Sequence, residues 1–176
     1  TVVIVLTLAL AVAEAAFARC PDSGLIAAAH GLALSDVGRY EEAVLAYDRC
    51  LAKPDPLWMA PVLANRGNAL ARLGRVDEAA EAYRRAVEIE PSRSSHYANW
   101  SRLCLDAGRL DEALRVCQDG LARSTTDLLH ARLHGDMAFA YAERGDAESC
   151  LQSADEAVRL DPSGIRERYL RGRALA

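Results

Sequence analysis

Small and apolar residues recur at spacings of four and three along the chain. The clearest series is Ala79, Tyr83 and Ala86, which follows Gly74. Charged residues occupy the positions between them, so the stretch 77–90 predicts an amphipathic helix that begins just after the glycine. Acidic residues at its start favour this helix, because they complement the positive end of the helix dipole.

The same pattern occurs four times in the chain, with a period close to 34 residues. The glycines before it are 36, 34 and 37 residues apart, so a 34-residue unit with insertions of two and three residues explains the spacing. They are Gly38, Gly74, Gly108 and Gly145. Seven residues before each glycine stands a small residue, namely Gly31, Gly67, Ser101 or Ala138. A glycine here ends one helix in a left-handed turn, which predicts one helical hairpin in each unit.

This arrangement resembles the tetratricopeptide repeat, in which small, aromatic, alanine and proline positions recur across 34 residues. The expected array covers residues 24–176. Its units are 24–57, 60–93, 94–127, 131–164 and a partial fifth at 165–176. The resemblance implies an all-α fold, a right-handed superhelical solenoid of antiparallel helix pairs. In each unit helix A precedes the central glycine and helix B follows it.

The resemblance also implies a concave groove, lined mainly by helix A, that binds an extended peptide or a partner subunit. The polar and aromatic residues at its groove positions are Asn65, Asn68, Arg72, Asn99, Arg102, Arg132, Phe139, Arg166, Tyr169 and Arg173. Asparagine can pair with a peptide backbone because its amide both donates and accepts, and arginine favours carboxylates. The lysines of the family's carboxylate-clamp pattern are missing, since Ala28 and Leu32 stand in the first unit's groove positions. Binding of chaperone tails is therefore not expected.

The apolar segment 1–20 differs from the repeats, because residues 1–18 contain a single charged residue, Glu14. Three interpretations stay open. The segment is a secretory signal with its cleavage region near residues 16–18, a membrane anchor or docking helix, or helix B of an earlier repeat. The matching small residues of such a helix B are Ala9, Ala13 and Ala16.

The uncharged stretch 1–13 favours contact with lipid or with a partner. The first two interpretations predict a membrane-associated, periplasmic or exported protein, and the third a cytoplasmic one. The leading hypothesis is an interaction scaffold, tethered to a membrane if residues 1–18 are an anchor. The alternative is a structural subunit of a membrane complex, held through its amino-terminal helix.

Candidate chemistry adds little to this picture. A net charge of −4 disfavours binding to nucleic-acid phosphates. His130 and His134 share a helix face, but a structural zinc site normally needs four ligands. Cysteines fall at packing positions, and Cys104 with Cys117 is the one pairing within a hairpin worth testing. We therefore expect no enzyme activity, no cofactor and no metal.

Overall fold

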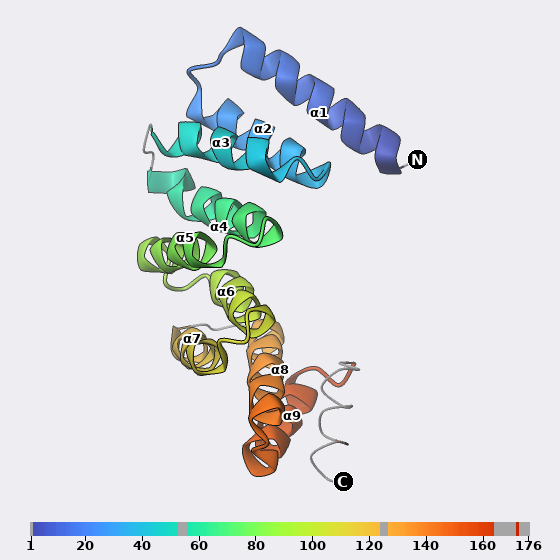
Figure 1. Cartoon of the computed structure of the whole chain (residues 1–176), viewed down its shortest axis with the longest axis vertical. Coiled ribbons are helices and arrows are strands. Elements are labelled where there is room, and N and C mark those ends of the chain that lie inside the picture. The colour runs from blue at the N-terminus through green and yellow to red at the C-terminus, as the bar shows by residue number, and fades with distance from the viewer. Residues whose placement is uncertain (1, 53–55, 124–126, 164–171, 173–176) are drawn as a thin grey trace. The chain divides into compact units, whose positions relative to one another are not determined.

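The computed structural model describes residues 2–52, 56–123, 127–163 and 172, and the regular structure in these ranges is helical throughout (Figure 1). The prediction of an all-α fold is therefore confirmed. In chain order the helices are α1 (Val2–Arg19), α2 (Gly24–Asp36), α3 (Tyr40–Leu51), α4 (Pro56–Arg72), α5 (Val76–Ile89), α6 (Ser94–Asp106), α7 (Leu110–Arg123), α8 (Asp127–Arg144) and α9 (Ala147–Leu160). The partial unit expected at 165–176 lies outside the described residues, apart from Gly172.

Glycines close the hairpins α2–α3, α4–α5, α6–α7 and α8–α9. They are Gly38, Gly74, Gly108 and Gly145, with φ between 71° and 83°. Glycine adopts this left-handed conformation without the steric cost that a Cβ atom brings. The next residue in each hairpin donates its backbone N–H to a carbonyl five residues earlier, as Arg75 does to Leu70 at 3.0 Å. These bonds satisfy carbonyls at the end of helix A and fix the turn.

The helices form two compact units, Thr1–Ile89 and Glu90–Ala176, and each is described by itself. In the first unit α1 packs on α2, and the α2–α3 hairpin packs on α4. In the second unit α8 contacts α6, α7 and α9. Successive hairpins within a unit thus bury their apolar faces against each other, as expected of helical repeats.

Helix A and helix B approach closely because a small residue meets a large one at their crossing. In the first unit Gly31 faces the ring of Tyr47, and Gly67 faces the ring of Tyr83. A Cβ atom added at Gly67 would lie 2.9 Å from Cε1 of Tyr83, which is too close for two carbon atoms. In the second unit the residues that meet at the crossing of helix A and helix B are both small or medium-sized. Ala138 of α8 and Ala154 of α9, for example, are fully buried there.

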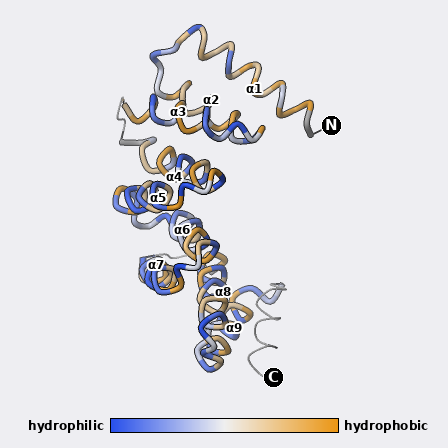
Figure 2. The backbone as a smooth tube through the Cα atoms, viewed as in Figure 1, coloured by the Kyte–Doolittle hydropathy of each residue, from blue (hydrophilic) through white to orange (hydrophobic). Residues whose placement is uncertain are grey.

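The amino-terminal segment forms α1, which is hydrophobic along most of its length (Figure 2). Its contact with α2 corresponds to that of α3 with α4 and of α7 with α8, so α1 takes the place of a helix B. Phe17 stacks on His30 with ring centroids 5.0 Å apart, and Glu14 pairs with Arg39 at 3.0 Å. None of the helices in the described ranges has the length and apolar character needed to cross a membrane.

Candidate functional site

The predicted groove residues that the structure describes lie on α4 of the first unit and on α6 and α8 of the second. Those on α4 are Asn65, Asn68 and Arg72, and those on α6 and α8 are Asn99, Arg102, Arg132 and Phe139. The other three, Arg166, Tyr169 and Arg173, lie outside the described residues. Helices α6 and α8 bring two of the predicted residues together, since Arg132 contacts Asn99, and the candidate site is built there.

Asp136 of α8 is the buried centre of this site. Its carboxylate is 1% exposed and accepts two hydrogen bonds from α6. Ser101 Oγ donates one of them at 2.7 Å, and Arg102 Nη2 donates the other at 3.1 Å. A buried carboxylate needs such partners, because removing its charge from water is costly. The guanidinium of Arg102, whose side chain is 40% exposed, is thereby held at the surface where the two helices meet.

A second arginine lies across the same pair of helices. Nη2 of Arg132 is 3.4 Å from the carbonyl oxygen of Ala98 and 3.4 Å from Oδ1 of Asn99. Both contacts cross from α8 to α6, one repeat back in the sequence. We call the surface formed by Asn99, Ser101, Arg102, Arg132 and Asp136 the α6–α8 seam. It combines two positive charges with one negative charge, and each guanidinium has more N–H donors than these contacts use.

Two members of the seam were not among the predicted groove residues. Ser101 was expected only as a small packing residue, yet its hydroxyl donates to Asp136, and the carbonyl oxygen of Ala98, 3.1 Å from Oγ, shares the same proton. Asp136 stands at a groove position, but its burial depends on the neighbouring helix. The only sequence signal was a serine in a small column with a carboxylate one repeat and one residue later.

Phe139 is the remaining predicted groove residue on α8. It is partly buried and packs against a core cluster that includes Cys104, Leu105 and Ala140. In the structure its ring therefore contributes to the interface between hairpins.

In the first unit two predicted groove residues of α4 contact tyrosines of neighbouring helices. Asn68 contacts Tyr83 of α5, and Arg72 contacts Tyr40 of α3. The hydroxyl of Tyr83 donates to Oδ1 of Asn68 at 2.6 Å. The guanidinium of Arg72 lies over the ring of Tyr40, 5.3 Å from its centroid. Asn65 is half-buried on the same helix. These contacts orient the Asn68 amide and the Arg72 guanidinium. The electrostatic attraction between the guanidinium and the tyrosine ring contributes modestly to the stability of this arrangement.

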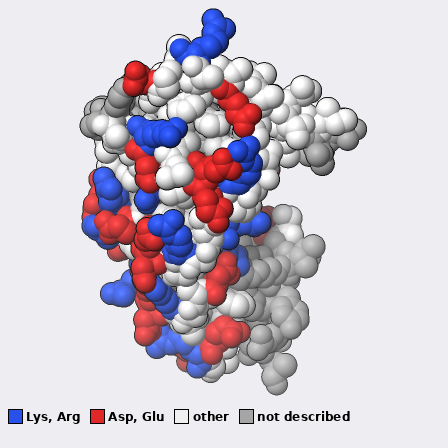
Figure 3. Space-filling view, turned by 45° about the horizontal axis from the view of Figure 1, so that its top comes forward, with Lys and Arg blue, Asp and Glu red and all other residues white. Residues whose placement is uncertain are grey.

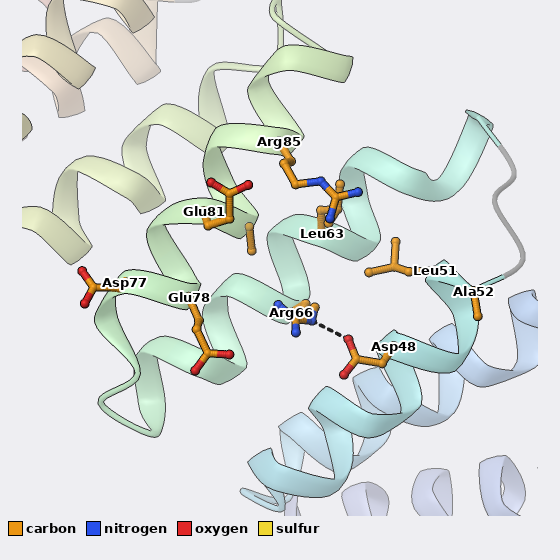
Figure 4. Close-up of a pocket in the computed structure, with 10 residues that line it drawn as sticks. Asp48, Leu51, Ala52, Leu63, Arg66, Asp77, Glu78, Glu81 and Arg85 are labelled. Carbon is orange, nitrogen blue, oxygen red and sulfur yellow. Dashed lines mark hydrogen bonds and ion pairs between the residues drawn. The ribbon is translucent and has the colours of Figure 1, made fainter.

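A cleft of about 620 Å³ opens on another face of the first unit, between α3, α4 and α5 (Figure 4). Arg66 and Asp48 form an ion pair at 2.6 Å inside it, and Leu51 and Leu63 supply apolar surface. Its rim carries charged residues of α5, namely Asp77, Glu78, Glu81 and Arg85. The sequence analysis did not predict this cleft, because it requires three helices from two repeats.

Outside the cleft, acidic and basic side chains lie beside one another on the face seen in Figure 3. Many of them form ion pairs three residues apart, such as Arg75 with Glu78 at 2.6 Å. The pair with Arg75 lowers the pKa of Glu78 below its ordinary value. Exposed pairs of this kind add little stability, but on this face they leave no broad field of one sign.

Two of the cysteines, Cys104 and Cys117, lie buried in the second unit. Burial raises the pKa of Cys104 and of Cys117 to about 12, so both thiols stay protonated near neutral pH. The pairing considered between them is not formed, and none of the five cysteines forms a disulfide. No cluster of three or more potential metal ligands occurs among the described residues, those around His130 and His134 included.

Comparison with known proteins finds a family match to one repeat of the chain. The tetratricopeptide-repeat family model matches residues 60–93. None of the curated proteins matches the sequence.

Solved structures with the same fold are similar over nearly the whole chain. One is YrrB, described as a tetratricopeptide-repeat protein with an unusual peptide-binding site, which is 21% identical over 97% of this chain and 85% of its own, with a TM-score of 0.76. MamA is 14% identical over 87% of this chain and 86% of its own, with a TM-score of 0.77. The carboxy-terminal part of a tetratricopeptide-repeat protein from Cytophaga hutchinsonii is 18% identical over 96% of this chain and 65% of its own, with a TM-score of 0.81. The chain therefore contains a tetratricopeptide repeat at residues 60–93, and its fold is that of the tetratricopeptide-repeat solenoids.

Proposed function

We propose that the chain is a protein-interaction scaffold whose α6–α8 seam holds an extended, acidic or polar peptide segment. The observation that carries the proposal is the pair of guanidinium groups, Arg102 and Arg132, fixed over the seam by acceptors within the protein. A side chain already held in place loses less conformational entropy when a ligand binds. The proposal requires no chemical reaction by the protein.

Binding at the seam would rest on charge and on hydrogen bonds. A ligand carboxylate would accept N–H groups of the two arginines, and such charge-assisted bonds are about twice as strong as neutral ones. The side-chain amide of Asn99 carries donors suited to a peptide carbonyl. The seam has one more positive than negative charge, which disfavours basic peptides. Support by analogy comes from YrrB, whose description mentions a peptide-binding site.

The test is a binding measurement with two labelled peptides of twelve residues, one alternating Glu with Gly and the other alternating Lys with Gly. Fluorescence anisotropy should show saturable binding of the acidic peptide to the full chain and none of the basic one. The double variant Arg102→Ala with Arg132→Ala should weaken the acidic peptide by about tenfold or more, since a hydrogen bond to a charged group contributes roughly 1.5–3 kcal/mol.

A matched control is Arg159→Ala, which removes an exposed, ion-paired arginine from α9 of the same unit. This variant should bind the acidic peptide as the parent chain does. Equal losses in both variants would mean that net charge, and not the seam, attracts the peptide. Binding that survives the double variant would contradict the proposal outright.

A further inference from the structure

An arginine occupies a packing position in the cleft between α3, α4 and α5, which we call the first-unit cleft. This residue is Arg66, and the equivalent residues of the next two repeats are Trp100 and Met137. Both of these pack, partly buried, against a core cluster of the second unit. Arg66 instead brings a positive charge to this position, and its side chain is only 21% exposed. A charge withdrawn from water to this extent is costly unless partners compensate it.

The hydrogen bonds within the protein satisfy Arg66 only in part. Its Nε donates to Oδ1 of Asp48 at 2.6 Å, and this bond holds the guanidinium across the cleft (Figure 4). Neither Nη1 nor Nη2 has an acceptor among the residues that the structure describes. A guanidinium carries most of its N–H donors on these two atoms. The donors of both Nη atoms are therefore available to a ligand.

A second guanidinium belongs to the same end of the cleft. Arg85 of α5 is exposed and forms no hydrogen bond or ion pair in the described part of the chain. It lies two residues after Tyr83, which meets α4 at Gly67, and the two helices run antiparallel. Arg85 therefore comes beside Leu63, one turn before Gly67, and Figure 4 shows Leu63 between the two arginines.

Apolar surface lines this end of the cleft as well. Leu63 is buried at its floor, Leu51 of α3 is partly buried across from it, and Ala52 beside Leu51 is exposed. The volume of about 620 Å³ is within the range of roughly 300–1,000 Å³ that is typical of ligand pockets. The three walls are consecutive helices inside the repeat array. This end of the cleft thus offers an apolar floor beside two guanidinium groups.

Carboxylates also line the first-unit cleft, but two of them are already bound by arginines. Glu78 accepts hydrogen bonds from Arg75 at 2.7 and 2.6 Å. Glu81 accepts them from Arg84 at 2.9 and 2.7 Å. Because each carboxylate is paired with its own guanidinium, these two residues add little net charge to the cleft.

The two ends of the cleft therefore differ in charge. Asp77 lies eight residues before Arg85, which is roughly 12 Å along the axis of α5 at 1.5 Å per residue. At the end near Leu63, Arg66 and Arg85 supply two positive charges against the one negative charge of Asp48. This local excess favours an anion, and guanidinium groups bind carboxylates through paired N–H···O bonds.

We propose that the first-unit cleft binds an acidic side chain and an apolar side chain of one extended segment in a partner protein. The ligand carboxylate accepts N–H groups of Arg66 and Arg85, and the apolar side chain covers Leu51 and Ala52. Residues i and i+2 of an extended chain point to the same side, roughly 7 Å apart, so the expected motif is an acidic residue, any residue and an apolar residue. The contact goes beyond that proposed for the α6–α8 seam, because it lies in the other unit and requires an apolar group.

The probe is a labelled peptide of nine residues that carries Glu, Gly and Leu, in this order, between flanking Gly and Ser residues. Fluorescence anisotropy should show saturable binding to the full chain. Arg66→Met should weaken binding by at least tenfold, because it removes the central guanidinium. This variant copies Met137 of a later repeat, so circular dichroism should show unchanged helix content. Arg85→Met changes an exposed side chain and should weaken binding several-fold, which gives a second result that does not depend on a packing position.

Two control variants make the result specific. Arg72→Met removes the same charge from the same helix outside the cleft and should leave the affinity as it is. Arg102→Ala with Arg132→Ala removes the arginines of the α6–α8 seam and should also leave this affinity unchanged. The failure of the seam proposal and the failure of this one are thereby distinguishable. In the probe, Gln in place of Glu and Ser in place of Leu should each weaken binding at least tenfold.

Several outcomes would overturn the proposal. Binding that survives both Arg66→Met and Arg85→Met would show that the peptide lies elsewhere, and a loss in the seam variant would place it at the seam. Tighter binding of a peptide with Lys in place of Glu would mean that the carboxylates of the rim select the ligand. Light scattering that shows a dimer of the full chain, dissociated by Arg66→Met, would replace the partner segment by a second copy.

Discussion

At the scale of single residues, the buried histidines connect pH to stability. Burial lowers the pKa of His96 below its ordinary value, and the nearby positive charge of Arg93 acts in the same direction. Glu90, 3.7 Å from Nε2, opposes them without reversing the shift. The pKa of His134 is lowered as well, again mainly by burial. Both side chains are therefore held in their neutral form.

We expect the melting temperature to fall as the pH drops from 7.5 to 5.5. A histidine with a lowered folded-state pKa binds fewer protons in the folded than in the unfolded state, so its folded form loses stability below the unfolded value of about 6.5. The change His96→Phe should reduce this fall, since it removes one titrating group from a site only 4% exposed. Thermal scans across this range measure it. A fall of the same size in His96→Phe would exclude the histidine as its source.

Residue roles within the seam could be predicted only in part. The arginines follow from their repeat columns, because the family resemblance assigns those columns to the groove. Their partners do not, since the pairing of Ser101 and Arg102 with Asp136 joins side chains 34 and 35 residues apart on different helices. A repeat position describes a residue within one repeat, whereas these hydrogen bonds depend on how two successive repeats pack.

At the scale of elements, the contact of Gly67 with Tyr83 controls how closely α4 and α5 approach. We expect Gly67→Ala to destabilise the protein by about 1–3 kcal/mol, the usual cost of overpacking a core. The gain of up to about 1 kcal/mol in helix propensity from replacing glycine offsets part of this cost. Chemical denaturation measures the balance.

The double variant Gly67→Ala with Tyr83→Ala imitates the alanine pair of α8 and α9 and separates the two effects. Its loss of stability should be smaller than the sum of the two single losses, because the clash disappears with the ring. Additive losses would mean that the tyrosine ring shifts freely and that the close approach does not depend on glycine.

Helix starts were harder to predict than helix ends. Each helix A ends before its glycine, where the backbone conformation itself is the signal. However, α4 and α8 begin at residues 56 and 127, four residues before the expected starts of their repeats at 60 and 131. The repeat columns mark packing contacts, and a helix can continue beyond them where nothing interrupts it. Pro61, the sixth residue of α4, lies just beyond the N–H groups that lack helical partners, and the helix nevertheless includes it.

At the scale of the whole molecule, the least repeat-like stretch of sequence turned out to resemble a repeat in its packing. The lack of charge in residues 1–13 indicated a covering by lipid or by a partner. In the structure α2 covers one side of this helix, and the other side is exposed. The hydropathy of a sequence predicts that a helix buries its apolar residues, but it does not predict which helix packs against them. That depends on how the helices are arranged in the fold.

Local stability should follow this arrangement. Within the described part of the first unit, α1 packs mainly against α2 and touches α3 through Phe17 and Arg49, whereas α4 packs against α2, α3 and α5. Opening of α1 therefore exposes less buried surface and disrupts fewer neighbours, and its amides should exchange with solvent on the order of tenfold faster than those of α4 or more. Hydrogen–deuterium exchange read by mass spectrometry measures this in peptides from both helices. Protection of α1 equal to that of α4 would contradict the expectation.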